Sequence, residues 1–302
     1  MALAVAGALV SGCAQPDAPV ARGDRPTIVS LNPCADAILA EVAPPGALLA
    51  ISHYSHDPGA TSMELAKARQ FHSTGGTVEE ILALDPDIVI ADTFLAPATR
   101  SALERLGYRI ETIAIASTVS DSKAQVTQLA KVAGDPLAGK VLNARIDTAL
   151  AAAEPVDRER PAALVWQAGG IVPGEGTLVA ELLARSGFAN HSAIRGMAQA
   201  DYLPLESVLA DPPDVVLAAG SGEGGANRQL THPALTSLVG TRREAFDPAL
   251  LWCGGPTIIR AAERLAEVRA STRPREGGDL PRGGERLPAS RERDSTLTST
   301  SP

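Results

Sequence analysis

Three of the five histidines in this chain, His53, His56 and His72, fall within a stretch of twenty residues. Imidazole is the commonest side-chain ligand for zinc and related metals. The cluster could therefore hold a bare divalent cation, or supply an axial ligand to a metal that is already chelated. No HxxxH or CxxC spacing fixes a coordination geometry, so isolated surface histidines are the competing interpretation. A bare-metal protein that uses all three histidines stays an alternative hypothesis.

After Cys13, the chain contains two further cysteines, Cys34 and Cys253. A reactive thiolate at either position would make an exported enzyme, although the sequence around Cys253 lacks the second cysteine of a CxxC motif. The two cysteines could instead pair, but their long separation predicts no geometry. No P-loop, GxSxG or HExxH motif is present, and the glycine-rich residues 220–225 lack GxGxxG spacing. We therefore expect no enzymatic activity and no resident cofactor.

Aromatic residues make up only 3% of the chain. Several of them, including Tyr54, Phe94 and Trp252, lie in loops next to predicted strand ends. Flat macrocycles and catecholates bind between apolar walls. We therefore predict ligand contacts for these three side chains, with ordinary packing as the competing interpretation. Trp166 falls at the end of an apolar strand pattern and is expected in the core.

The predicted elements alternate between strand and helix. Apolar runs predict strands at 27–31, 48–52, 88–91, 108–115, 162–166 and 214–219, and helical patterns occupy 35–41, 78–84, 98–106, 177–186, 205–210 and 257–269. Such alternation is typical of parallel sheets covered by helices, whose ligands bind beyond the carboxyl ends of the strands. The residues predicted to bind ligand at these ends and in nearby loops are Asn32, Pro33, His53, Tyr54, His72, Phe94, Trp252 and Cys253.

A purely helical stretch divides this alternating pattern. Helices are predicted at 121–133 and from Pro136 to about residue 153, the second with apolar residues at Leu137, Val141, Ile146, Ala149 and Leu150. At 1.5 Å per residue the second helix would span roughly 27 Å, about the width of a small domain. The expected fold is α/β, with parallel-sheet lobes at 26–120 and 156–270, linker helices at 121–155, and a ligand cleft between the lobes.

The two ends of the chain differ from its body. Residues 1–13 form a short apolar run ending in VSGC, which is similar to a bacterial lipobox and predicts export with a lipid on Cys13. Residues 14–25 suit a tether, and residues 271–302 are too polar to form a core and are expected to be disordered. The net charge of −8 argues against nucleic acid as a partner. We therefore expect a periplasmic monomer, which the lipid on Cys13 would anchor to the membrane.

Four pieces of sequence together resemble the helical-backbone solute-binding proteins of ABC importers for ferric siderophores, haem and cobalamin. They are residues 28–32, the block 79–89, the long linker helix and the block 206–216. Both blocks combine a helix, an Asp-Pro-Asp or Pro-Pro-Asp turn and a strand, as though one unit occurred in each lobe. The resemblance covers about residues 26–270.

This resemblance implies a function. Members of the family hold a metal chelate between their lobes and deliver it to an ABC permease in the inner membrane. One surface glutamate per lobe pairs with permease arginines, and Glu79 and Glu206 match those positions. Tyr54 is similar to a cleft tyrosine of the cobalamin-binding member. That member also has an arginine near the loop where this chain has Trp252 and Cys253, so the resemblance does not say which chelate is bound.

Overall fold

The first lobe is built on a five-stranded sheet. The computed structural model describes residues 25–220 and 230–271. The strands run in the order β3-β2-β1-β4-β5 and are all parallel. Their bounds are β1 Ile28–Ser30, β2 Leu48–Ser52, β3 His72–Thr74, β4 Ile88–Asp92 and β5 Arg109–Ile113. The helices of this lobe are α1 Pro33–Val42, η1 His53–His56, α2 Leu65–Ala68, α3 Val78–Leu84 and α4 Pro97–Arg105.

The second lobe repeats the plan with a smaller sheet, in the order β11-β10-β6-β8, again all parallel. Its strands are β6 Ala162–Gln167, β8 Ala189–Asn190, β10 Val215–Ala219 and β11 Arg242–Phe246. A separate antiparallel pair joins β7 Ile171–Val172 to β9 Asp201–Tyr202. The helices are η2 Ala168–Gly170, α7 Leu178–Arg185, α8 His191–Ile194, α9 Leu205–Ala210, α10 Pro233–Thr236, η4 Pro248–Leu250 and α11 Thr257–Ser271. The predicted α/β fold with two parallel-sheet lobes is confirmed.

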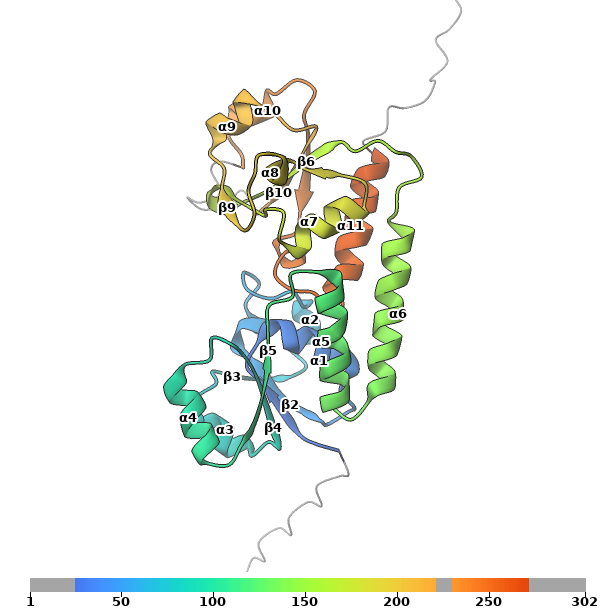
Figure 1. Ribbon diagram of the computed structural model, residues 1–302. Helices are drawn as coiled ribbons and strands as arrows, with labels where there is room; N and C mark the ends of the chain where they lie inside the picture. The colour runs from blue at the N-terminus through green and yellow to red at the C-terminus, as the bar shows by residue number, and fades with distance from the viewer. Residues whose placement is uncertain (1–24, 221–229, 272–302) are drawn as a thin grey trace, which may run out of the picture.

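Two long helices, α5 Val119–Val132 and α6 Pro136–Ala152, connect the lobes. Helix α6 runs along the side of both lobes and packs against α5 on the first and against α11 on the second (Figure 1). Asp135 caps α6 through a hydrogen bond from the Ala138 N–H at 3.0 Å, and Pro136 occupies the first turn, where a missing N–H is tolerated. The 17 residues of α6 span about 25 Å at 1.5 Å per residue.

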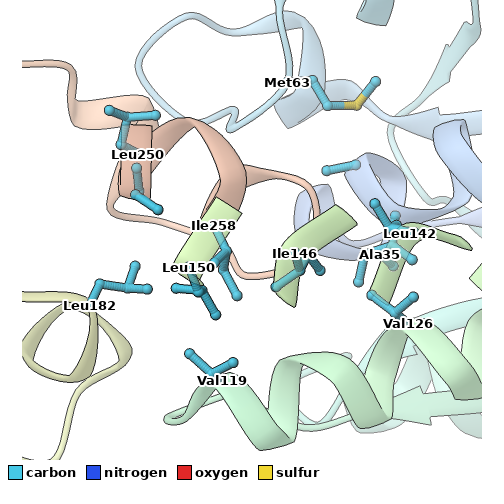
Figure 2. Packing of buried hydrophobic residues seen from close by; sticks show 14 of the residues in the cluster. Ala35, Met63, Val119, Val126, Leu142, Ile146, Leu150, Leu182, Leu250 and Ile258 are labelled. Carbon is cyan, nitrogen blue, oxygen red and sulfur yellow. The ribbon is translucent and has the colours of Figure 1, made fainter. Parts of the chain in front are cut away.

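The buried face of α6 agrees with the predicted one at Ile146 and Leu150 but not in the first half of the helix. Leu142, Ile146 and Leu150 are buried at four-residue spacing, whereas Leu137 and Val141 are 68% and 53% exposed. Figure 2 shows the three buried side chains in a row, from Ala35 and Val126 at the first-lobe end to Leu182 and Ile258 at the other. All of them belong to a single apolar cluster. Helix α6 therefore joins the two lobes through one continuous core.

The Asp-Pro-Asp and Pro-Pro-Asp turns do the same structural work in each lobe. In the first, a carboxylate oxygen of Asp87 accepts hydrogen bonds from the Thr27 N–H and hydroxyl, both at 2.8 Å. In the second, Asp214 accepts the Ala162 N–H at 2.7 Å. Each aspartate thus ties the start of its own strand to the start of the neighbouring parallel strand. The two sequence blocks are equivalent in structure as well as in pattern.

Candidate ligand-binding cleft

A cavity of about 400 Å³ opens between the lobes, at the carboxyl ends of both parallel sheets. This is where open parallel sheets generally bind ligands. The first lobe and α5 contribute Asn32, Cys34, Asp92, Thr93, Phe94, residues 113–117 and Gln125. The second lobe contributes Gln167, Ile171, Pro173, residues 176–179, Gln199, Ala200 and residues 251–254. Both lobes therefore line one cleft.

On the first-lobe side, Asn32 and Asp92 hold the ends of two neighbouring strands together. The Asn32 side-chain oxygen caps α1 by accepting the N–H groups of Cys34 and Ala35 at 2.9 and 3.0 Å. Its amide donates to Asp92 at 3.0 Å, and the second oxygen of Asp92 accepts the Phe94 N–H at 2.7 Å. Because of this cap, α1 begins at Pro33, two residues before the predicted start. Pro33 itself is absent from the cleft lining.

On the second-lobe side, two backbone segments lie unusually close together. The N–H groups of Gly174 and Gly176 donate to the carbonyls of Gln199 and Ala198 at 2.9 and 2.6 Å. A Cβ on Gly174 would lie 2.3 Å from the Gln199 carbonyl oxygen, and one on Gly176 would lie 2.9 Å from the Ala198 carbonyl oxygen. Only glycine fits either position. The two glycines therefore fix Gln199 at the wall of the cleft.

A disulfide between Cys34 and Cys253 crosses between the lobes within the cleft lining. Next to it, the Gly255 N–H donates to the Ser122 hydroxyl at 2.6 Å, and a Cβ on Gly254 would lie 2.3 Å from that hydroxyl. The segment before α11 is therefore held tightly against α5. Because both sulfurs are bonded to each other, neither is a free thiol, and the hypothesis of an enzyme with a nucleophilic Cys34 or Cys253 is wrong for this state.

Apolar side chains from both lobes stand exposed in the cleft lining. Phe94 and Ile115 of the first lobe are 75% and 72% exposed, and Trp252 and Ile171 of the second are 48% and 46% exposed. An unliganded protein gains nothing from leaving such side chains in water, so an exposed apolar group of this kind marks a binding surface. Trp166, in contrast, is fully buried as predicted, and its ring N–H donates to the Leu203 carbonyl at 3.2 Å.

The histidine cluster lies apart from this cavity. His53 and Tyr54 follow β2 in η1, with their rings 4.1 Å apart, and His72 begins β3 opposite Ala50. Neither they nor His56, whose ring nitrogen lies 3.0 Å from the Ala68 carbonyl, line the cavity. Across residues 25–220 and 230–271, no group of three or more His, Cys, Asp or Glu side chains could hold a metal. The structure does not support the bare-metal alternative.

Asp36 holds η1 in place from behind the cleft. One of its carboxylate oxygens accepts the Ser52 N–H at 2.9 Å and the Ser55 hydroxyl at 2.6 Å. Burial raises the pKa of Asp36 to about 8, against the lowering effect of hydrogen bonds from Ser30, Ser55 and Ser52. Desolvation outweighs hydrogen bonding here because the side chain is fully buried. Through Ser52 and Ser55, Asp36 therefore holds in place the η1 turn that carries His53 and Tyr54.

Glu79 and Glu206 occupy matching positions, each exposed in the first turn of its helix. The neighbouring Glu80 is committed to the predicted capping box, in which it exchanges hydrogen bonds with Thr77 at 3.2 Å. Glu79 makes no such contact within the described chain, so a cap does not account for it. Helices α3 and α9 lie on the side of their lobes away from α6 (Figure 1). The two carboxylates are therefore available to a partner that spans both lobes.

A two-lobed α/β body with an inter-lobe cleft suggests comparison with known families. Residues 28–238 match a family model described as periplasmic binding protein. The chain belongs to this family. The match runs from β1 through α10 and so includes most of both lobes and both linker helices.

Individual relatives of this periplasmic binding protein are distant in sequence. A cobalamin-binding protein of Halobacterium salinarum is 23% identical over 202 residues, which are 65% of this chain and 54% of the relative. The chain thus spans about half the length of the curated relatives it matches.

Solved structures share the fold. A periplasmic haem-binding protein from Roseiflexus sp. RS-1 aligns with a TM-score of 0.65 and 22% identity, over 82% of this chain and 97% of that one. A haem-binding protein from Pseudomonas aeruginosa aligns with a TM-score of 0.63 and 23% identity, over 81% of this chain and 92% of that one. The vitamin B12 binding protein of Vibrio cholerae aligns with a TM-score of 0.61 and 18% identity, over 82% of this chain and 98% of that one.

Sequence reasoning missed several residues that line the cleft of this periplasmic binding protein. Ile115 was assigned to a strand, but β5 ends at Ile113, so residues 114–117 form a cleft loop. A predicted strand that ended at Ile113 would have placed Ile115 in the cleft loop. Gln125 and Gln199 carry no comparable signal, because their positions depend on how α5 and the loop beside β9 pack. Of the predicted ligand-binding residues, Asn32, Phe94, Trp252 and Cys253 line the cleft, and their contact with a ligand stays a prediction.

Proposed function

We propose that this chain is the substrate-binding component of an ABC importer. It captures a bulky metal chelate in the inter-lobe cleft and passes it to a membrane permease. The observation that carries the proposal is the cleft itself, to which both lobes contribute exposed apolar walls together with amide and hydroxyl groups. Such a surface suits a large planar ligand that is held and then released, and family membership agrees with binding rather than catalysis.

The class of ligand follows from the relatives. The names of three similar proteins refer to haem, cobalamin and vitamin B12, which are metal ions inside large planar macrocycles. Facing apolar groups such as Phe94 and Trp252 fit the two faces of a macrocycle better than they fit a bare ion. Ferric siderophores belong to the same broad class of bulky chelates and stay within the proposal.

Delivery requires recognition by a permease. Glu79 and Glu206 supply one exposed carboxylate per lobe, on helices at equivalent places in the two repeated units. Paired charges of this kind steer association and fix orientation more than they add affinity. We therefore assign these two glutamates to docking, opposite basic residues of the permease.

The cellular location follows the family. We place the mature chain in the periplasm as a monomer, held to the membrane by a lipid on Cys13 after removal of an export signal. Cys13, the tether and the tail after Ser271 lie outside the residues that the structure describes. Within residues 25–220 and 230–271, no helix is both long enough and apolar enough to cross a membrane.

Thermal unfolding of the purified chain with a ligand panel tests this function. The panel contains cobalamin, haem and a set of ferric siderophores. A ligand at 100 times its Kd stabilises the folded state by about 2.7 kcal/mol, a readily measured rise in Tm. We expect at least one chelate to give this rise without chemical turnover. A chain that is indifferent to every chelate would overturn the proposal.

A further inference from the structure

The polar groups that line the cleft are almost all neutral. Asp92 is the one ionisable side chain among the described lining residues, since Cys34 and Cys253 are paired. The remaining side-chain polar groups of the lining are carboxamides, hydroxyls and the indole N–H of Trp252, with glutamines contributed by three separate parts of the fold. Gln125 comes from α5, Gln167 is the last residue of β6, and Gln199 lies beside β9.

The carboxylate of Asp92 has only neutral partners. It accepts hydrogen bonds from the Asn32 amide and the Phe94 N–H, and it forms no ion pair within the described residues. The Arg100 guanidinium donates to the Asp92 main-chain carbonyl at 3.3 Å and to the Thr112 hydroxyl at 3.4 Å, and not to the carboxylate. The negative charge of Asp92 is therefore not neutralised by a direct partner, and it lies in the lining of the cleft.

Resting on the proposed function, we infer that this cleft selects a chelate whose rim carries neutral carboxamides over one whose rim carries carboxylates. Two carboxylates in a partly desolvated cleft repel each other more strongly than they would in bulk water. Carboxamides, in contrast, can donate to Asp92 and exchange hydrogen bonds with the glutamine side chains. A buried polar group left without a partner costs free energy, so matching amide to amide favours the neutral rim.

A pair of matched corrins isolates this effect. Dicyanocobinamide has an amide-bearing rim, whereas dicyanocobyrinic acid has the same macrocycle and metal with free carboxylates. Titration of the full chain with each should give a Kd for cobinamide at least tenfold lower. This corresponds to about 1.4 kcal/mol.

Two variants locate the selectivity. Asp92→Asn removes the charge and should improve cobyrinic acid binding at least fivefold. Because this change also alters the hydrogen bond to Asn32, a second variant adds charge instead: Thr93→Lys, at an exposed position in the lining, should improve cobyrinic acid binding similarly. Thr148→Lys on α6 makes the same change in net charge away from the cleft, and it should leave both affinities unchanged.

The outcomes separate the two proposals. Preference for cobinamide that is reduced by both cleft variants, but not by Thr148→Lys, supports the inference. Equal binding of the two corrins, or tighter binding of cobyrinic acid, overturns the inference and leaves the proposed function intact. If cobinamide, cobyrinic acid, haem and the siderophores all fail to bind, the proposed function fails, and this inference fails with it.

Discussion

Cys34 at the start of α1 and Cys253 before α11 are joined by a disulfide with their Cα atoms 5.1 Å apart, across a sequence separation of 219 residues. The bond links the lobes within the lining of the cleft. It lies beside the Gly255–Ser122 hydrogen bond, and Ser62 adds a further tie by donating its hydroxyl to the Ala249 carbonyl at 2.7 Å. The Trp252 loop is therefore anchored to the first lobe by covalent and polar contacts.

Removing the disulfide should weaken both the fold and the cleft. A crosslink that closes a loop this long stabilises the folded state by restricting the unfolded chain, typically by about 2–5 kcal/mol. We expect the Cys34→Ser, Cys253→Ser double variant to lose stability in this range when denaturant unfolding is measured. Wild-type protein reduced by a dithiol should behave in the same way. Equal stability of the oxidised, reduced and serine forms would show that the bond does not anchor the loop.

The apolar walls should carry much of the binding free energy. Truncating Trp252 or Phe94 to alanine removes a large apolar surface from one side of the ligand, and we expect Kd for the bound chelate to rise at least tenfold. Isothermal titration measures the change. Leu106→Ala is the control, because Leu106 is 52% exposed and lies outside the cleft lining. Unchanged affinity in both cleft variants would place the ligand elsewhere.

Some of this site could be predicted from sequence and some could not. Asn32 and Phe94 could be predicted as cleft residues because each lies just after a strongly apolar strand pattern. Parallel strands bring their carboxyl ends to one edge of the sheet. Strand β11 was missed because its sequence, RREAF, is charged as the exposed edge of a sheet requires. The exposure of Leu137 and Val141, which were predicted on the buried face of α6, has a different cause. The apolar residues of α6 surround much of the helix, so only contact with α5 and α11 decides which are buried.

The pH dependence of stability should report on Asp36. Its folded-state pKa of about 8 lies above the ordinary aspartate value of 3.8, so between these pH values the folded protein retains a proton that the unfolded chain releases. The stability contribution is therefore complete at low pH and is lost as pH rises toward 8, by up to about 1.4 kcal/mol per pH unit. Asp36→Asn should flatten this fall.

Urea unfolding of both proteins at pH 5 and pH 7.5 measures the difference. All other ionisable groups are common to the two proteins, so their contributions cancel in the comparison. If wild type and Asp36→Asn lose stability in parallel as the pH rises, Asp36 is already ionised in the folded chain.

Charge reversal at the docking positions should separate binding from transport. We expect Glu79→Arg, Glu206→Arg to abolish uptake of the chelate by cells carrying the permease, while Kd of the purified chain stays within twofold of wild type. The control is Glu154→Arg, Glu263→Arg, which makes the same charge change at exposed positions at the end of α6 and on α11. Equal uptake by the two double variants would remove Glu79 and Glu206 from the docking surface.

Hydroxyl-radical footprinting of the chain with and without saturating cobalamin, read by mass spectrometry, tests the central claim most directly. The account predicts that cobalamin protects Phe94, Ile115 and Trp252 from oxidation, because the ligand covers both walls of the inter-lobe cleft. Leu106 and Val156, which are exposed outside the cleft lining, should react equally in both samples. Protection confined to His53 and Tyr54, or no protection at any of these positions, would contradict a ligand held between the lobes.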